Sequence, residues 1–410
     1  MFASNLLQQV LAFATVLGIA KLLSPSDFAL VRISQAYISV LLIVGAGGVT
    51  APVLRYCADA QFDGTARRAL LGHSLKVVFV TSLLVTAVSL MAALARYTLY
   101  TDEQFVFVAY ALQLPAVAAT SVFFVYLQAI QEFRRLAVSQ VWLKMFSLVV
   151  ILSGAFWYGL YGLLIAAGTA AWFGVLVTYR LTSPVFQLSR SLAVPKDYSS
   201  LARYSVFGML VSALGQSSDL ILLDAVGADK NAIGAYSLAC VFLLAAGVIV
   251  GTAQSMATPA FTALIKQPEK FRKQLKVWSV AMFAASVPVA LGLVALAWVL
   301  ERWFFAAQYD GFSQVLALLM IKFCLWSTYA IGGAALVGAG AIRKGSWVAV
   351  ITTILAFVAG FPMCAEFGIW GAAWTQVAVA LVSFVLVWWV IREELKNLTR
   401  NQNFHSTGSY

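Results

Sequence analysis

Long apolar runs separated by short polar segments dominate the chain. A helix rises about 1.5 Å per residue and needs about 20 apolar residues to cross about 30 Å of hydrocarbon. Twelve stretches approach this length and predict transmembrane helices over 2–23, 28–54, 74–95, 105–130, 137–157, 160–179, 204–225, 232–264, 277–300, 314–338, 346–365 and 369–391. They are too long for transmembrane β-strands and show no strict alternation. The pattern therefore predicts an all-α multi-pass membrane protein.

The first run has no basic segment before it and no cleavage site of small residues after it. It therefore predicts a first transmembrane helix, not a signal peptide. This helix starts almost at the first methionine. Two explanations are open: a few cytoplasmic residues are missing, or the start codon is wrongly assigned.

Composition narrows the class further. The 410 residues are 62% hydrophobic and 10% charged, whereas a soluble domain carries about a quarter charged residues. A soluble enzyme, a nucleic-acid-binding module and a disordered scaffold are excluded. The net charge of +11 is explained by basic residues that set the membrane topology and contact anionic lipid headgroups, so it does not indicate nucleic-acid binding. Two histidines and four cysteines without a CxxC pair predict no metal site, disulfide framework or cofactor.

Basic residues set the orientation. With the N-terminus inside, 20 of the 27 Lys and Arg residues fall in inner loops and 5 on the outer side, and Lys144 and Lys322 lie within spans. Basic residues concentrate in cytoplasmic loops. Both termini are therefore predicted to be cytoplasmic.

The second half of the chain repeats the first. When the chain is aligned with itself at an offset of 209 residues, the basic pair at 134–135 falls on the basic pair at 343–344. The segment Tyr158-Gly159-Leu160-Tyr161-Gly162 falls on Phe367-Gly368-Ile369-Trp370-Gly371. Six spans separate the copies, so both halves face the same way, and a transporter of this kind binds substrate between its lobes. We expect an N-lobe over 1–180, a cytoplasmic linker over 181–203, a C-lobe over 204–391 and a polar cytoplasmic tail over 392–410.

Ionisable side chains inside the membrane are costly, so each is a functional candidate. Lys322 is the strongest candidate for an anion site, although a structural pair would also explain it. Lys144 and Arg32 are weaker candidates, because snorkelling explains Lys144 better than a site does and Arg32 begins a span, where an interfacial anchor is the better explanation. Asp219 could pair with Lys322, carry a coupling proton or be satisfied by packing alone.

Uncharged polar residues and prolines complete the candidates. Glutamines within spans suit a hydroxyl-rich ligand but also join helix to helix; they are Gln128, Gln140, Gln216, Gln254 and Gln376. Prolines within spans are expected to kink helices and free carbonyls; they are Pro115, Pro288 and Pro362.

Two motifs resemble those of a known family. Leu22-Leu23-Ser24-Pro25-Ser26-Asp27-Phe28 is similar to the loop after helix 1 of Wzx-type polysaccharide and O-antigen flippases, in the multidrug/oligosaccharidyl-lipid/polysaccharide (MOP) exporter superfamily. Asp219-Leu220-Ile221-Leu222 followed by Gly234-Ala235-Tyr236-Ser237-Leu238-Ala239 resembles the family's helix 7 and helix 8. Ala29 and Val31 replace the family's usual Gly and Tyr.

The resemblance implies two six-helix lobes in a V that alternates between inward-open and outward-open states. It implies an undecaprenyl-diphosphate-linked oligosaccharide as cargo, an ion gradient as driving force, and glycan polymerase and chain-length machinery as candidate protein partners. Lys322, Lys144 and Arg32 are the cations available to attract the diphosphate.

Other functions fit less well. A cation or drug antiporter of the same superfamily binds cations through carboxylates in helix 1 or 7. The first predicted span of this chain contains no carboxylate. The lipid II flippase family is similar in fold but has fourteen spans and a markedly arginine-rich cavity, whereas this sequence predicts twelve spans. A membrane glycosyltransferase or polymerase needs a large outer loop with catalytic carboxylates, which the short outer loops do not supply. No P-loop is present, so ATP does not drive the chain directly.

Overall fold

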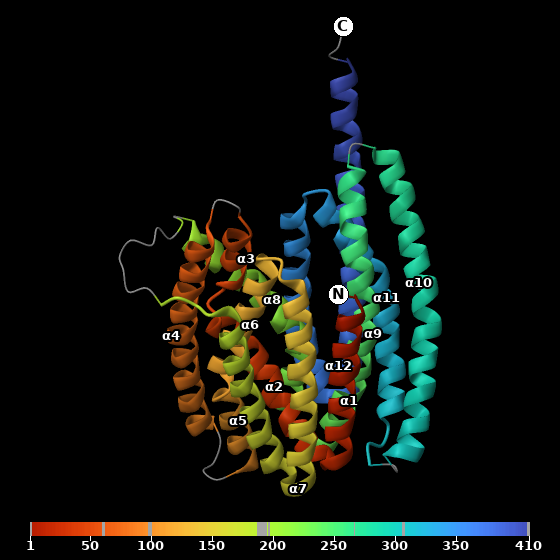
Figure 1. Cartoon of the computed structure of the whole chain (residues 1–410). Helices are drawn as coiled ribbons and strands as arrows, with labels where there is room; N and C mark the ends of the chain where they lie inside the picture. The colour runs from red at the N-terminus through yellow and green to blue at the C-terminus, as the bar shows by residue number, and fades with distance from the viewer. Residues whose placement is uncertain are drawn as a thin grey trace. The chain divides into compact units, whose positions relative to one another are not determined.

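The computed structural model describes residues 2–59, 62–96, 101–186, 195, 197–265, 267–305 and 308–407, with side chains omitted for 2–6, 342 and 397–407. Helices account for nearly all of these residues, and no strand occurs among them (Figure 1). The helices are α1 (Phe2–Leu22), α2 (Pro25–Gly45), α3 (Thr50–Ala58), α4 (Gly64–Arg96), α5 (Asp102–Ala111), α6 (Leu114–Ala129), α7 (Phe133–Thr182), α8 (Tyr198–Ala225), α9 (Lys230–Ala263), α10 (Pro268–Val299), the π-helix η1 (Leu300–Phe304), α11 (Phe312–Gly338) and α12 (Ile342–Thr407). The all-α prediction is confirmed.

Nine helical segments within the described ranges are long and apolar enough to cross a membrane. The apolar part of α1, Leu7–Leu22, is shorter than this length. The helices α7 and α12 each contain two of the spans expected from sequence, one on either side of a kink. The protein is therefore a multi-pass membrane protein, and the count of twelve spans stays a prediction.

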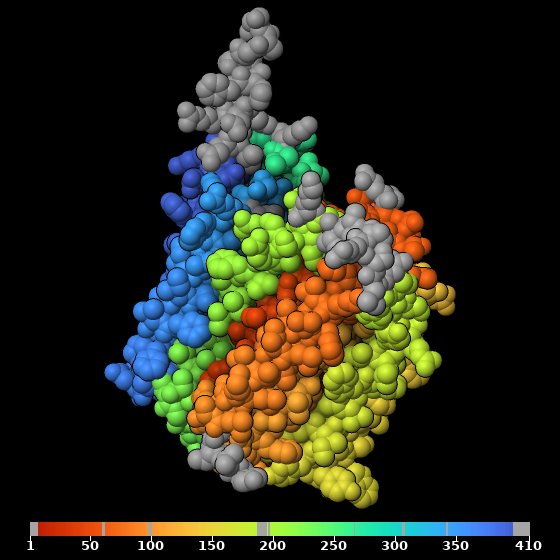
Figure 2. Space-filling model, turned by 90° about the vertical axis from the view of Figure 1, so that its left-hand side faces the viewer, coloured from red at the N-terminus to blue at the C-terminus, as the bar shows by residue number. Residues whose placement is uncertain are grey.

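Large apolar side chains on the surface mark where lipid meets the protein. The helix α4, orange in Figure 2, exposes between 55% and 62% of Phe79, Val80, Leu84, Val88 and Met91. A soluble protein rarely exposes a continuous apolar face of this length. This face of α4 is consistent with contact to hydrocarbon.

Two predicted spans are interrupted. The expected helix over 28–54 ends at Gly45 and resumes as α3 at Thr50, because Gly47 and Gly48 adopt φ values of +57° and +64° that favour glycine. The expected helix over 105–130 breaks between α5 and α6, and Pro115 lies in the first turn of α6, where its missing N–H costs nothing.

The repeated turns are the two kinks of the long helices. Gly159 in α7 has φ +57° and ψ −135°, and Gly368 in α12 has φ +54° and ψ −130°. Gly154 and Gly162 lie on opposite sides of the kink in α7, and their backbones are in contact. A straight helix would hold them about 12 Å apart. The chain therefore folds back into a helical hairpin, at the position that the sequence repeat indicated.

The Ser-Pro-Ser-Asp segment of the first family motif is a helix cap. Ser24 is the N-cap of α2, and its hydroxyl oxygen accepts the backbone N–H of Asp27 at 3.1 Å. The Ser24 hydroxyl in turn donates to the Asp27 carboxylate at 2.7 Å, and Pro25 occupies the first helical position. This arrangement satisfies donors that a helix start leaves open.

The chain divides by internal contacts into unit 1, Met1–Ser217, and unit 2, Ser218–Tyr410, so that α8 begins in one unit and ends in the other. The core of unit 1 gathers α3, α4 and α6 around Leu71, Phe123 and Tyr126. The core of unit 2 gathers α9, α10, α11 and α12, with Phe261 and Phe271 rings 5.0 Å apart.

The predicted boundaries at 180, 203 and 391 are not tested by this division. Of the predicted linker, residues 187–194 and 196 lie outside the described residues, together with the basic residues Arg190 and Lys196. Lys266, counted among the inner basic residues, lies outside them as well.

Candidate functional site

A buried polar cluster in unit 2 contains the residue that the sequence placed first. Lys322 lies ten residues into α11, about 15 Å from its start. Its Nζ donates to Oε1 of Gln376 on α12 at 2.6 Å, and Nε2 of Gln376 makes a long contact of 3.5 Å with Oγ of Ser218 on α8. Gln376 and Ser218 are buried. The lysine is thus held by a neutral amide, which leaves its charge uncompensated at that contact.

Asp219 lies beside these residues and has a different set of partners. Its Oδ2 accepts the hydroxyl of Tyr236 on α9 at 2.7 Å, and its Oδ1 accepts the backbone N–H of Leu220 at 2.8 Å. The carboxylate also acts electrostatically on Lys322. No ion pair joins Lys322 to Asp219 among the described residues. We call Lys322, Gln376, Ser218, Asp219 and Tyr236 the Lys322 cluster.

The Lys322 cluster explains the second family motif. The aspartate and the tyrosine, 17 residues apart, form one buried hydrogen bond between α8 and α9. The next loop is fixed by Asp229, the N-cap of α9, and by the Lys230–Asp224 ion pair at 2.9 Å. The motif therefore joins two helices and holds a carboxylate near a lysine inside the membrane.

Tyr236→Phe tests that bond. The variant should lose about 1–3 kcal/mol of unfolding free energy, because the Asp219 carboxylate then stays buried without its hydroxyl donor. Thermal unfolding of the purified protein in detergent measures the change. Equal stability of the Tyr236 variant and wild type would contradict the proposed strength of the bond.

Unit 1 carries two smaller polar groups. Arg32 Nη1 on α2 donates to Gln35 Oε1 at 2.8 Å, and Gln35 Nε2 donates to the Tyr110 hydroxyl on α5 at 3.0 Å. Gln8 of α1 donates to Gln140 of α7 at 3.2 Å. Arg32 is thus part of a hydrogen-bonded chain within the helices.

Lys144 lies one turn after Gln140 on α7, and its side chain is exposed on the surface. No ion pair or hydrogen bond of Lys144 occurs within the described part of the chain. Its role in attracting an anion stays a prediction.

The remaining candidates are not gathered into one site. Gln254 joins α9 to α11 by donating to the Ala330 carbonyl at 3.1 Å, a helix-to-helix bond. Gln216 donates to Ser212 on its own helix at 3.1 Å, and Gln128 is exposed. Pro288 and Pro362 lie inside α10 and α12. Their effect on helix bending stays a prediction.

Sequence reasoning missed several partners of the predicted residues. Tyr236 was quoted only as part of a motif, and Ser218, Gln35 and Tyr110 were not singled out. Three of the bonds follow no local pattern, because they join residues 17 to 158 positions apart, whereas the Arg32–Gln35 bond spans only three positions. Two signals were available: the placement of Asp219 and Tyr236 in one motif, and the three-residue spacing that puts Gln35 one helical turn after Arg32.

No group of three His, Cys, Asp or Glu side chains that could hold a metal ion occurs among the described residues. Cys57, in the short helix α3, is buried, and burial raises the pKa of its thiol to about 12. A thiol with such a pKa is not a reactive thiolate at neutral pH.

The long apolar helices of the described residues define a multi-pass membrane protein. Residues 1–265 match the polysaccharide biosynthesis protein family, and the chain belongs to that family. No curated protein sequence matches the chain.

Solved structures share the fold at low sequence identity. The chain is similar to the lipid II flippase MurJ in an inward closed conformation, with a TM-score of 0.77, 12% identity, and coverage of 98% of this chain and 90% of that one. It is also similar to an inward-facing multidrug resistance MATE transporter of the MOP superfamily, with a TM-score of 0.69, 16% identity and 96% of both chains covered. A MOP superfamily transporter from Pyrococcus furiosus, described as having a binding pocket of reverse polarity, gives a TM-score of 0.67 at 16% identity, with 97% and 95% covered.

Proposed function

We propose that this protein flips an oligosaccharide linked to undecaprenyl diphosphate from the cytoplasmic to the outer leaflet of a bacterial inner membrane. The observation that carries the proposal is Lys322, a cation inside the membrane whose hydrogen-bond partner is a neutral glutamine, in a chain of the polysaccharide biosynthesis family. A diphosphate crossing the bilayer needs a cationic partner. Lys322 supplies one from unit 2, and Arg32 and Lys144 are the candidates in unit 1.

Alternating access driven by an ion gradient is the mechanism that the fold supports. The MATE and MurJ structures with this fold include inward-facing, outward-facing and inward closed states. Asp219 is the candidate coupling group in unit 2, because its carboxylate is buried and acts on Lys322. Proton uptake by Asp219 would change the charge beside the lysine and thereby its hold on an anion.

Two related functions define the alternatives. Asp219 would also suit a cation or drug antiporter, since a buried carboxylate attracts cations. The likeness to MurJ over most of both chains makes lipid II the competing lipid-linked cargo. A glycan polymerase or chain-length regulator would act after the flipping step as a partner.

A deletion strain separates these functions. Loss of a surface glycan, with its undecaprenyl-linked intermediate retained on the cytoplasmic face, is the expected result. Complementation with the wild-type gene should restore the glycan. Accumulation of lipid II would instead identify that cargo. Unchanged glycan together with new sensitivity to cationic dyes would show a drug antiporter and overturn the proposal.

A further inference from the structure

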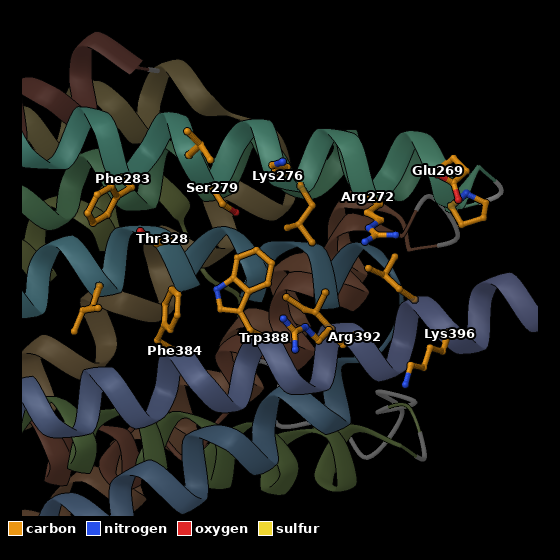
Figure 3. A pocket seen from close by; sticks show the side chains of 16 residues that line it. Glu269, Arg272, Lys276, Ser279, Phe283, Thr328, Phe384, Trp388, Arg392 and Lys396 are labelled. Atoms are coloured by element: carbon orange, nitrogen blue, oxygen red, sulfur yellow. The ribbon is translucent and has the colours of Figure 1, made fainter.

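Unit 2 contains a groove that is separate from the Lys322 cluster. It has a volume of about 1140 Å³ and lies between α10 and α12, with α11 behind them. Figure 3 shows the side chains of α10 and α12 facing each other across it. The lining runs from Pro268 to Phe283 on α10, about 22 Å along the helix, and from Phe384 to Lys396 on α12. The groove is thus longer than one leaflet of hydrocarbon, about 15 Å.

One end of the groove is strongly basic. Arg272 and Lys276 stand one turn apart on α10, and Arg392 and Lys396 stand one turn apart on α12. Glu269 is the one carboxylate of the lining. The charge distribution of the sequence predicts this end to face the cytoplasm, where anionic headgroups lie.

The acidic residues next to the groove on α12 have another partner. Lys344 binds Glu394 at 2.8 Å and Glu393 at 3.5 Å. Neither carboxylate lines the groove. No ion pair involves Arg272, Lys276, Arg392 or Lys396 within the ranges that the structure describes. The basic end therefore retains its positive charge.

The rest of the groove is mainly apolar. Val280 and Phe283 on α10, Leu325 on α11 and Phe384 on α12 line it. These residues belong to helices long and apolar enough to cross the membrane. A basic end that continues into an apolar channel fits a charged headgroup followed by hydrocarbon chains.

Two buried polar atoms stand where these regions meet. Ser279 Oγ and Trp388 Nε1 line the groove, and neither has a hydrogen-bond partner among the described residues. Ser279 is more than nine-tenths buried. Figure 3 places Ser279 and Trp388 beside Lys276. An orphaned buried donor is costly, and a phosphate or ester oxygen of a lipid would satisfy both.

The internal repeat does not by itself produce the groove. In unit 1 the chain leaves α7 at Ser183, and the Val185 N–H then donates to the Arg68 carbonyl of α4 at 3.4 Å. The Val185 carbonyl also lies against Gly72 of α4. In unit 2 the corresponding helix α12 continues without a break past Lys396. The end of α12 and the segment after α7 therefore run differently beside α10 and α4.

We propose that the groove binds an anionic glycerophospholipid with two phosphates, of the diphosphatidylglycerol type, from the cytoplasmic leaflet. The four cations form two pairs on opposite walls, so each phosphate meets one cation from α10 and one from α12. Ser279 and Trp388 donate to the glycerol region, and the acyl chains lie on the apolar wall. The lipid bridges α10 and α12 and stabilises unit 2. This site is independent of the transported substrate.

Lipid binding to the purified full-length protein tests the proposal. Native mass spectrometry would compare diphosphatidylglycerol, phosphatidylglycerol, phosphatidylcholine and undecaprenyl diphosphate on wild type and on Arg272→Gln/Lys276→Gln. Diphosphatidylglycerol should bind wild type most tightly and should bind the double variant about 30-fold more weakly. It should also raise the melting temperature of wild type and not of the variant.

Lys270→Gln/Lys273→Gln is the matched control, because it removes two exposed cations from the same end of α10 that do not line the groove. The control should bind the lipid as wild type does. Trp388→Phe, which keeps the ring and removes the donor, should weaken binding several-fold. An equal loss in the control pair, equal binding of phosphatidylcholine, or tighter binding of undecaprenyl diphosphate would each overturn the proposal.

Discussion

Lys322→Ala is expected to abolish surface glycan while the protein remains in the membrane. The substitution removes the cation bonded to Gln376 and leaves the Asp219 carboxylate to repel an approaching phosphate. Loss of one cationic partner costs about 2–5 kcal/mol in recognition, which corresponds to roughly 30- to 4,000-fold weaker binding of the diphosphate. Surface glycan in the complemented deletion strain, read with membrane protein level, measures the effect.

Two variants make the Lys322 result specific. Lys322→Arg keeps the charge and should retain part of the activity, although the planar guanidinium does not reproduce the single bond to Gln376. Lys344→Ala removes a cation at the surface that forms ion pairs with Glu393 and Glu394, and ion pairs of surface lysines contribute little to stability. Full activity of Lys322→Ala, or an equal loss in Lys344→Ala, would contradict the anion-site proposal.

Gly371→Ala is expected to prevent stable folding of unit 2. A methyl group at this position would overlap the backbone carbonyl of Met363 in the preceding half of α12. Backbone cannot move aside as a flexible side chain can, so the cost should exceed about 3 kcal/mol. The protein level in the membrane and the melting temperature in detergent report the loss.

The repeat supplies a second test, and α10 supplies the control. Gly162→Ala should destabilise unit 1 for the same reason, since its methyl group would overlap the Gly154 carbonyl. Gly292→Ala is the control. Gly292 lies within α10, and no atom lies within 4 Å of the position that an added methyl group would take. It should be neutral or stabilising by about 0.5–1 kcal/mol, because alanine favours the helix. Normal melting of Gly371→Ala would show that the hairpin of α12 tolerates separation of its halves.

The Lys322 cluster and the groove have different roles in unit 2. The Lys322 cluster places a cation and a carboxylate inside the membrane, where a transported anion and a coupling ion would act. The groove places four cations at the end of α10 and α12, where a resident lipid would hold the helices. Variants of the groove should therefore change stability and lipid retention, whereas variants of Lys322 should change transport.

The amino-acid sequence determined the class of protein and much of its helical layout. Apolar runs of about 20 residues with few charges have one stable form in hydrocarbon, a helix that satisfies its own backbone. The sequence also located the turns at Gly159 and Gly368, because an aromatic-Gly motif recurs 209 residues later. The hydropathy pattern did not predict the break at Gly47 and Gly48, because apolar residues continue on both sides of it. Hydropathy gives no information on backbone dihedral angles.

The tertiary structure alone decided which polar residues meet. Lys322 was found as an embedded charge, but its partner Gln376 is 54 residues away and could not be chosen from five candidate glutamines. Arg272, Lys276, Arg392 and Lys396 counted in sequence only as topology signals, and they become a site because α10 and α12 stand apart over α11. Hydropathy is a property of each segment and can be read along the chain. Hydrogen bonds and grooves depend on how segments pack, and apolar helices in a membrane leave many packings open until their few polar residues find one another.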